Sequence, residues 1–317
     1  MKPTEELEPP SLAIAVLTFR RPSDLAEVIP LLLEQALQVA ALARGHVLVV
    51  DNDPGASARE FVESYPPQTT PLIYVHEPQP GITAARNRAL SASAENDMLV
   101  FIDDDERPSA EWLRSLLEVR RASGCAAVAG PVISAYDREP EAWITAGRYF
   151  ERLRHETGAE LIVAATNNLL LDLRQIRAFG LSFDPGLGIS GGGDTLFTRQ
   201  IVAHGGRMLW SAEASVTDVV PRARVTRRWV VLRAFRSGNS WSVTSLLLAP
   251  DTLSRARTRL TLSARGGARA GLGLAQIVAG MLRVSPAWRA RGTRTLARGA
   301  GMLSGAWGYG YREYRRR

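Results

Sequence analysis

Four short apolar runs, separated by stretches with helical periodicity, constrain the fold of this chain more than any other feature. Each run is rich in Val, Ile and Leu, which is typical of strands buried on both faces. The runs are SLAIAVLTF (11–19), HVLVVD (46–51), PLIYVH (71–76) and MLVFID (98–103). The patterns at 22–43, 56–64, 81–93 and 110–123 predict helices. Strands that alternate with helices predict a mostly parallel α/β sheet covered on both faces.

Polar clusters follow three of these predicted strands at the point where each one ends. TFRRPSD (18–24) follows the first strand, DNDPG (51–55) the second and DDDER (103–107) the fourth. Ligands of open α/β sheets bind outside the carboxyl ends of the strands. We therefore expect a ligand site where these three clusters meet.

The cluster after the fourth strand places three like charges in succession, at Asp103, Asp104 and Asp105. Crowded carboxylates repel one another unless a cation, a proton or a basic partner lies among them. Mg²⁺ or Mn²⁺ takes oxygen ligands, often one or two carboxylates together with water and substrate phosphates. The alternative is a solvated acidic turn before the helix at Ala110, where carboxylates suit the positive end of the helix dipole. The position at a strand end favours the metal-binding interpretation.

The C-terminal part of the chain is strongly basic. From Arg222 onward, 20 arginines stand against two acidic residues, whereas residues 1–221 hold 19 basic and 30 acidic residues. This asymmetry indicates a polyanionic partner, either a nucleic acid or an anionic membrane face. The longest apolar run there, 271–282, is too short to span a bilayer. After Gly124 the strand-like pieces are shorter, at 126–134 and 159–171, and a basic helix is expected at 225–241.

Cysteine usage and the first residues bear on the compartment. The single cysteine, Cys125, excludes an internal disulfide framework and a multi-cysteine metal cluster. The opening MKPTEELEPP is acidic and proline-rich, unlike the basic start and apolar stretch of a secretory signal. We therefore expect a cytoplasmic protein. We also expect two parts, an α/β domain at 1–225 and an arginine-rich, mainly helical region at 226–317.

A series of motifs, in order along residues 12–238, resembles those of the family 2 glycosyltransferases. The motifs are AIAVLTFRRPSDL (13–25), VLVVDNDP (47–54), PGITAARNRAL (80–90), LVFIDDDERPSAEWL (99–113), AATNNLLL (164–171) and GGGDTLFTRQIVAHGG (191–206). The resemblance implies an inverting enzyme with a GT-A fold, which is a Rossmann-like, mostly parallel sheet flanked by helices. In this chain a basic helical C-terminal extension would follow that fold.

The resemblance also implies roles for individual residues. Asp103 and Asp105 occupy the first and third positions of the family's DXD motif, so Mn²⁺ or Mg²⁺ would join the donor diphosphate to Asp105, with Asp103 close to the metal or the ribose. Asp194 would be the general base, and Gly193 stands where the family commonly has glutamate. The remaining residues implied in donor or substrate binding are Thr18, Arg20, Asp51, Asn52, Asp53, Arg86, Asp104 and Asn168.

The chemistry of sugar transfer fits these residue types. Displacement of a nucleoside diphosphate from an anomeric carbon builds negative charge on the leaving phosphate, which a divalent ion offsets. The acceptor hydroxyl needs a carboxylate within hydrogen-bond reach to take its proton. One metal and one base therefore suffice for direct inversion.

The resulting functional prediction is transfer of a sugar from a nucleotide-diphosphate sugar, with a UDP-sugar favoured, to a sugar, lipid-linked or glycan acceptor. Such a reaction would serve polysaccharide, glycolipid or cell-envelope glycan synthesis. The basic region would contact the inner, anionic face of the cell membrane peripherally, and nucleic acid is not expected as a partner. The alternative is a non-catalytic polyanion- or membrane-binding protein on the same scaffold, which leaves the aspartates without a role.

Overall fold

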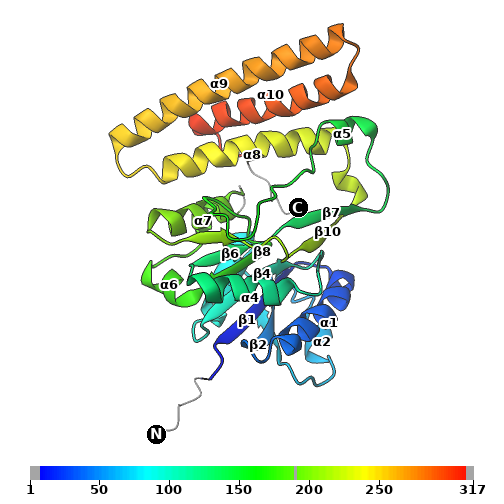
Figure 1. Ribbon diagram of the computed structural model, residues 1–317, viewed down its shortest axis with the longest axis vertical. Helices are drawn as coiled ribbons and strands as arrows, with labels where there is room; N and C mark the ends of the chain where they lie inside the picture. Colours follow the sequence, from blue (N-terminus) through cyan, green and yellow to red (C-terminus); the bar gives the residue numbers. More distant parts are fainter. Residues whose placement is uncertain (1–7, 189–190, 312–317) are drawn as a thin grey trace. The chain divides into compact units, whose positions relative to one another are not determined.

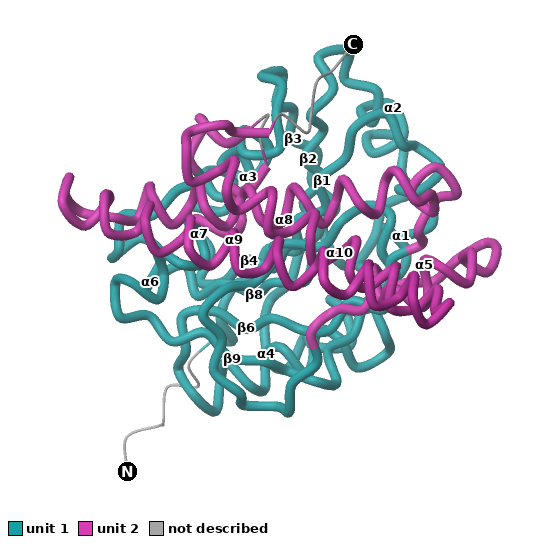
Figure 2. The backbone as a smooth tube through the Cα atoms, turned by 90° about the horizontal axis from the view of Figure 1, so that it is seen from above, with its two compact units in different colours: residues 1–133, 154–183, 197–218 teal, residues 134–153, 184–196, 219–317 magenta. Residues whose placement is uncertain are grey.

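The computed structural model describes residues 8–188 and 191–311, and Figure 1 shows its helices and strands. The chain divides into two compact units (Figure 2). Unit 1 comprises residues 1–133, 154–183 and 197–218, and unit 2 comprises residues 134–153, 184–196 and 219–317. Two segments before residue 225 thus belong to unit 2, and the expected division into domains at that residue stays a prediction.

Unit 1 is built around a seven-stranded sheet with the order β3-β2-β1-β4-β8-β6-β9. The strands are β1 (Ser11–Thr18), β2 (Arg44–Asp51), β3 (Leu72–His76), β4 (Met98–Asp103), β6 (Ala127–Ala129), β8 (Asn168–Asp172) and β9 (Met208–Trp210). The first four strands in the chain run parallel, and β8 runs antiparallel to both β4 and β6. The prediction of a mostly parallel sheet is confirmed.

The register of the parallel strands brings their polar ends to one edge of the sheet. Thr18 lies opposite Asp51, and Asp51 lies opposite His76. Asp103 pairs with Leu17, one residue before the end of β1. The three polar clusters predicted to meet therefore emerge side by side.

Both faces of this sheet are buried, as the continuous apolar runs predicted. Alternate residues of β1 enter different hydrophobic clusters, with Leu12, Ile14 and Val16 in one and Ala13, Ala15 and Leu17 in the other. Helices α1 (Pro22–Gln38) and α4 (Trp112–Ser123) contribute to the first cluster, and α3 (Ile82–Ala92) and α6 (Leu173–Ala178) contribute to the second. The short helix α2 (Arg59–Glu63) adds Val62 to the first cluster.

Several predicted elements differ in extent from the observed ones. The helix expected at 22–43 ends at Gln38, and of the strand expected at 159–171 only β8 forms. The strand expected at 126–134 is divided into β6 and β7 (Val132–Tyr136) around Gly130 and Pro131. A Cβ at Gly130 would lie 2.0 Å from the carbonyl oxygen of Ala214, and proline cannot donate to a strand ladder, so the chain bends here.

A second, three-stranded sheet has the order β5-β10-β7. In it, β5 (Glu106–Pro108) pairs antiparallel with β10 (Val216–Val220), which places Asp218 opposite Glu106. The remaining short elements are α5 (Ala142–Ala146), η1 (Pro185–Leu187), α7 (Gly193–Ala203) and η2 (Arg222–Arg224). This pairing brings an acidic residue of β10 to the chain segment that follows the three aspartates.

Unit 2 contains three long helices, α8 (Arg227–Leu247), α9 (Thr252–Leu282) and α10 (Pro286–Ala306), and α10 lies between the other two (Figure 1). Each begins with a capping side chain, since Thr226, Asp251 and Ser285 accept hydrogen bonds from backbone N–H groups three residues later. The basic helix expected at 225–241 corresponds to α8. Arg312 and the last three arginines of the basic region lie outside the described residues.

Glycines allow the backbones of these three helices to touch. A Cβ at Gly301 of α10 would lie 1.9 Å from the carbonyl oxygen of Phe235 in α8. On the opposite side, a Cβ at Gly273 of α9 would lie 2.4 Å from the backbone nitrogen of Leu296 in α10. Helix α10 is therefore held tightly against both neighbours, which fixes the backbone positions from which its side chains project.

Substitution of Gly301 by alanine is expected to destabilise the protein by about 1–3 kcal/mol, because the added methyl group would force α10 away from α8. Gly267 of α9 is the matched control, since a Cβ there would meet nothing within 4 Å. Gly267→Ala should instead stabilise the protein by about 0.5–1 kcal/mol, the helix propensity difference. Urea unfolding followed by circular dichroism measures both changes, and equal stabilities of the two variants would contradict the packing argument.

Candidate active site

Two of the three aspartates at the end of β4, Asp104 and Asp105, are held by side chains at the end of β1 and just after it. The hydroxyl of Thr18 donates to Oδ2 of Asp104 at 2.8 Å. One nitrogen of the Arg21 guanidinium donates to Oδ1 of Asp104 and to Oδ2 of Asp105, both at 2.8 Å. Arg21, which the sequence interpretation did not select although it adjoins Arg20, is thus the cation that bridges two of the three carboxylates.

Burial, and after it the repulsion from neighbouring carboxylates, disfavours the ionised forms of Asp103 and Asp104. Burial and the neighbouring charge of Asp105 raise the pKa of Asp103 to about 7, although Arg86 acts in the opposite direction. Burial also raises the pKa of Asp104 to about 6, with Arg21 limiting the rise. Burial alone would lower the pKa of Arg21, but the charges of Asp104 and Asp105 outweigh it and the net shift is upward. Additional positive charge is therefore favoured at this edge of the sheet.

Two further acidic residues that the sequence interpretation missed extend the cluster. Glu106 is 1% exposed, accepts a hydrogen bond from the backbone N–H of Asp103 at 3.3 Å and receives another from the side-chain amide of Asn167. Asp218, opposite Glu106 in the second sheet, is buried and also raises the pKa of Asp103. Glu106 directly follows the aspartates in the sequence, which was the available clue. Asp218 carries no local clue, because only the pairing of β10 brings it here.

The loop after β2 is shaped by Asp51 and Asn52. Asp51 is fully buried, and its carboxylate accepts hydrogen bonds from the backbone N–H groups of Asp53 and Ala58, at 3.0 and 2.8 Å, and from the Tyr74 hydroxyl at 3.2 Å. This geometry supports a role for Asp51 in fixing the loop, and its predicted contact with a nucleotide stays a prediction.

Asn52 connects this loop to the start of α3. Its amide nitrogen donates to the carbonyl oxygens of Glu77 and Gln79, at 2.9 and 2.7 Å, and its oxygen accepts from the N–H of Gly81 at 3.1 Å. Gly81 has φ 130°, a conformation that favours glycine, and α3 begins at the next residue. The side chain therefore fixes the position from which Arg86 projects.

Asp53 and Arg20 form an ion pair across the ends of β2 and β1, with 3.1 Å between Nε and Oδ1. Burial would raise the pKa of Asp53, but hydrogen bonds from Gly55, Ser57 and Arg20 outweigh it, and the net pKa lies below the usual value. The structure thus brings together two residues that the sequence interpretation selected separately.

Arg86 lies on α3 with its guanidinium 5.5 Å from the centre of the Phe183 ring. Its charge lowers the pKa of Asp103, so it is close enough to the carboxylate cluster to act on it. Asn87, the next residue, accepts from the N–H of Phe183 and donates to its carbonyl oxygen, both at 2.8 Å. Of the ARN motif, the arginine acts electrostatically on the carboxylate cluster, and the asparagine holds the backbone of Phe183.

Asn168 was selected as a substrate-binding residue, but in the structure its side chain connects neighbouring chain segments by hydrogen bonds. Its oxygen accepts from the Trp112 indole N–H at 2.8 Å, and its nitrogen donates to the carbonyl oxygens of Pro131 and Ala214, at 3.2 and 2.7 Å. The neighbouring Asn167, which the sequence interpretation passed over, is the one that reaches Glu106. A direct contact of Asn168 with substrate stays a prediction.

Asp194 belongs to unit 2 and is the second residue of α7. Its Oδ1 accepts a hydrogen bond from the backbone N–H of Thr195 at 2.8 Å. Helix α7 begins one residue earlier, at Gly193, so Asp194 lies inside its first turn. The preceding Gly191 and Gly192 have φ 77° and 89°, so the chain enters α7 through a left-handed turn that suits glycine.

The carboxylates of the cluster fit a divalent cation that is shared with a substrate phosphate. No group of three His, Cys, Asp or Glu residues within 8–188 and 191–311 is arranged to hold a metal ion by itself. Mg²⁺ and Mn²⁺ sites that also use substrate phosphates need only one or two carboxylates. The raised pKa of Asp103 and the crowding of Asp104 and Asp105 fit such a shared site.

Solved structures with the same architecture define the fold class. A mannosyltransferase from Pyrobaculum calidifontis, PcManGT in complex with GDP-Man and Mn²⁺, matches with a TM-score of 0.60 and 17% identity, covering 94% of this chain and 88% of that chain. S. aureus TarS 1–349 in complex with UDP-GlcNAc matches with a TM-score of 0.54 and 14% identity, covering 96% and 93%. The fold is that of the GT-A glycosyltransferases.

The sequence matches show the family. Residues 13–172 match the model of glycosyl transferase family 2. The succinoglycan biosynthesis protein ExoM of Rhizobium meliloti (strain 1021) is 40% identical over 228 residues, which are 72% of each chain. The chain belongs to glycosyl transferase family 2 and is a glycosyltransferase. The predicted family is confirmed, and these comparisons do not support the alternative of a non-catalytic binding protein.

Proposed function

We propose that this glycosyltransferase is inverting and metal-dependent, and that it adds a sugar from a nucleoside-diphosphate sugar to a growing glycan of an envelope or exported polysaccharide. The observation that carries the donor assignment is the cluster of Asp103, Asp104 and Asp105 at the end of β4, in which Thr18 and Arg21 hold the last two. A relative in succinoglycan biosynthesis supports the glycan acceptor. Neighbours with bound UDP-GlcNAc or GDP-Man support a nucleotide-sugar donor, and a UDP-sugar is the first candidate.

Asp105 and Asp103 are the residues that would hold the metal, Mn²⁺ or Mg²⁺. When bound, the ion would supply positive charge to the diphosphate that leaves the sugar. Arg21 fixes the orientation of Asp105, and Thr18 fixes that of Asp104. Arg86 and the Arg20–Asp53 pair supply the remaining charged groups around the predicted nucleotide position.

Asp194 is the proposed general base, which takes the proton of the acceptor hydroxyl as that oxygen attacks the anomeric carbon. One hydrogen bond to its Oδ1 orients the carboxylate. It lies in the first turn of α7, at the positive end of the helix dipole. A single displacement with one base inverts the configuration at the anomeric carbon.

The test is a thermal-shift series with nucleoside-diphosphate sugars, in Mn²⁺ and in EDTA. A donor that binds the folded state raises the melting temperature by mass action. We expect one nucleotide sugar to raise it in Mn²⁺ and to have little effect in EDTA. If every donor gives the same melting curve with and without metal, the proposed donor chemistry is wrong.

We further propose that unit 2 contacts an anionic membrane surface, at the inner face of the cell membrane. Helix α9 exposes a row of apolar side chains at successive spacings of 7, 14, 4 and 3 residues, which keep them on one side of the helix, and arginines lie on the same helix. The row comprises Leu253, Leu260, Leu274, Val278 and Met281. No helix in the described part of the chain is long and apolar enough to cross a membrane. Apolar side chains combined with arginines fit the interface of an anionic bilayer.

Membrane binding is expected to depend on both features of α9. In flotation with phosphatidylglycerol vesicles, binding should weaken with salt, because each basic residue near the surface contributes about 1 kcal/mol of electrostatic attraction. Replacing Leu274 and Val278 by aspartate should reduce flotation strongly, whereas Leu37→Asp, at an equally exposed position on α1, should not. Equal flotation with neutral phosphatidylcholine vesicles, or equal loss in the control, would contradict the proposal.

A further inference from the structure

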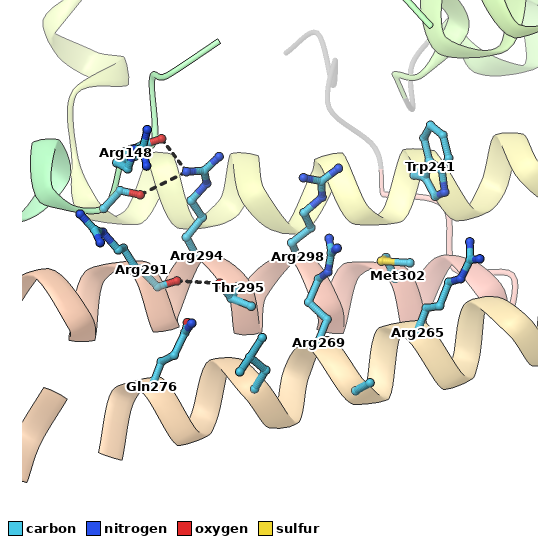
Figure 3. Close-up of a pocket in the computed structure, with 13 residues that line it drawn as sticks. Arg148, Trp241, Arg265, Arg269, Gln276, Arg291, Arg294, Thr295, Arg298 and Met302 are labelled. Carbon is cyan, nitrogen blue, oxygen red and sulfur yellow. Dashed lines mark hydrogen bonds between the residues drawn. The ribbon is translucent and has the colours of Figure 1, made fainter. Parts of the chain in front are cut away.

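Unit 2 contains a pocket of about 910 Å³, lined by helices α8, α9 and α10 and by the turn after α5 (Figure 3). Among the residues that the structure describes, its lining includes six arginines and no acidic residue. These arginines are Arg148, Arg265, Arg269, Arg291, Arg294 and Arg298, and the cavity that they line is called the arginine pocket below. Arg148 forms an ion pair with Glu151, which offsets one of the six charges. A strong positive charge therefore converges on one cavity.

The helical spacing explains why these arginines converge. Arg291, Arg294 and Arg298 are three and four residues apart on α10, so they share one face of that helix. Arg265 and Arg269 are four residues apart on α9. The two faces meet because the backbones of α9 and α10 touch at glycines.

The arginines have a partly fixed geometry. The Arg294 guanidinium donates to the carbonyl oxygen of Arg148 at 2.7 Å and to that of Gly147 at 3.4 Å (Figure 3). Arg291 donates through Nε to the carbonyl oxygen of Ala146 at 3.2 Å. Both side chains keep further N–H groups, because a guanidinium has five. A ligand would therefore meet donors that are already oriented.

The arginines also repel one another. Loss of surrounding water and the neighbouring charges of Arg269 and Arg294 lower the pKa of the Arg298 guanidinium. A multivalent anion would relieve this repulsion, whereas a single carboxylate would neutralise only one of the charges. Phosphate oxygens also match the planar fork of donors that arginine presents.

The rest of the lining indicates that the anion carries a larger group. Trp241, Leu272 and Met302 contribute apolar surface. The side-chain oxygen of Gln276, another lining residue, is buried and has no hydrogen-bond partner in the described structure. A hydroxyl group on the ligand would satisfy that oxygen.

We propose that the arginine pocket is a second anion site of this enzyme, which binds the phosphate or diphosphate group of a phosphate ester. The site goes beyond the proposed function, because the predicted donor diphosphate lies at the end of β4 in unit 1 and the arginine pocket lies within unit 2. Its ligand is a phosphate ester whose organic part lies against Trp241, Leu272 and Met302.

The test uses inorganic pyrophosphate as the probe, in calorimetry with the full chain, at about 0.15 M salt to screen exposed charges. EDTA is present throughout, which keeps metal-dependent binding at the aspartate cluster out of the measurement. The expected result is saturable binding to the wild type and a loss of affinity of at least about tenfold in the double variant Arg269→Gln and Arg298→Gln. Failure of the donor experiment would leave this result unchanged, so the two proposals fail separately.

Arg257→Gln is the matched control, because Arg257 is exposed on α9 outside the pocket. It should change the affinity for pyrophosphate by less than about twofold, as expected for a distant surface charge. The proposal is overturned if the double variant binds like the wild type, if Arg257→Gln weakens binding as much as the double variant, or if sulfate binds as tightly as pyrophosphate. Circular dichroism of each variant establishes that the helices have folded.

Competition on vesicles distinguishes the two sources of such a phosphate group. Vesicles that contain phosphatidic acid present a phosphate monoester on a lipid. If saturating pyrophosphate releases the wild type, but not the double variant, from these vesicles, the pocket takes a lipid headgroup. If pyrophosphate binds the pocket in calorimetry without affecting flotation, the ligand is a soluble phosphate ester.

Discussion

Asp194→Asn is expected to lower the rate of sugar transfer by about 10²–10⁴-fold, the usual contribution of a general base. Asparagine retains the size of the side chain and an oxygen that accepts from the N–H of Thr195. What it loses is the ability to take a proton from the acceptor hydroxyl. The affinity for the donor should stay within about twofold of the wild type, because the lost interaction acts in the transition state.

The measurement is single-turnover transfer, with donor binding followed separately by calorimetry. Asp184→Asn is the matched control, since Asp184 is a nearby aspartate of unit 2 that accepts a hydrogen bond from the N–H of Gly186. The control should retain transfer close to that of the wild type. Normal transfer by Asp194→Asn, or a loss of donor binding as large as the loss of rate, would show that Asp194 is not the base.

The sheet and its polar edge could be predicted because their information is local. Each parallel strand is a continuous apolar run, and residues such as Thr18, Asp51 and Asp103 stand directly where a run stops. Once the runs are strands of a parallel sheet, their ends must share one edge. The carboxylates at the strand ends, and Arg20, could therefore be predicted from the sequence.

The parts of the site that were missed depend on contacts between distant segments. Asp218 reaches the cluster through antiparallel pairing with Glu106, more than 100 residues earlier. Asn167 and Asn168 are adjacent, and successive side chains at a strand take different directions, so the sequence alone did not decide which one reaches Glu106. Arg21 was passed over for the same reason, since it and Arg20 bind different carboxylates.

The arginine pocket shows a similar limit in unit 2. The basic charge of the C-terminal region was evident from the sequence and was interpreted as a surface for a polyanion. Its concentration in one cavity results from the close packing of α9 on α10, where a Cβ at Gly299 would lie 2.6 Å from the backbone nitrogen of Ala270. Composition reports how much charge is present, whereas helix packing decides where it converges.

Asp105→Asn is expected to abolish the metal-dependent part of nucleoside diphosphate binding. Asparagine can still contact Arg21, so the loop after β4 should keep its shape, but it lacks the negative charge that a hard divalent ion needs. In Mn²⁺ the affinity for UDP should fall by at least about 100-fold, because even residues that only orient metal ligands typically contribute 10- to 100-fold. In EDTA the variant and the wild type should bind UDP equally weakly.

Asp24→Asn serves as the matched control for this prediction, because Asp24 also lies beside Arg21, with 4.0 Å between Oδ2 and Nε, but belongs to α1. Calorimetric titration of UDP in Mn²⁺ should give nearly the same affinity for this control as for the wild type. If Asp105→Asn retained metal-dependent binding, the ion would have to be held by Asp103 and the remaining carboxylates. If Asp24→Asn weakened UDP binding equally, the effect would come from Arg21 and not from a metal ligand.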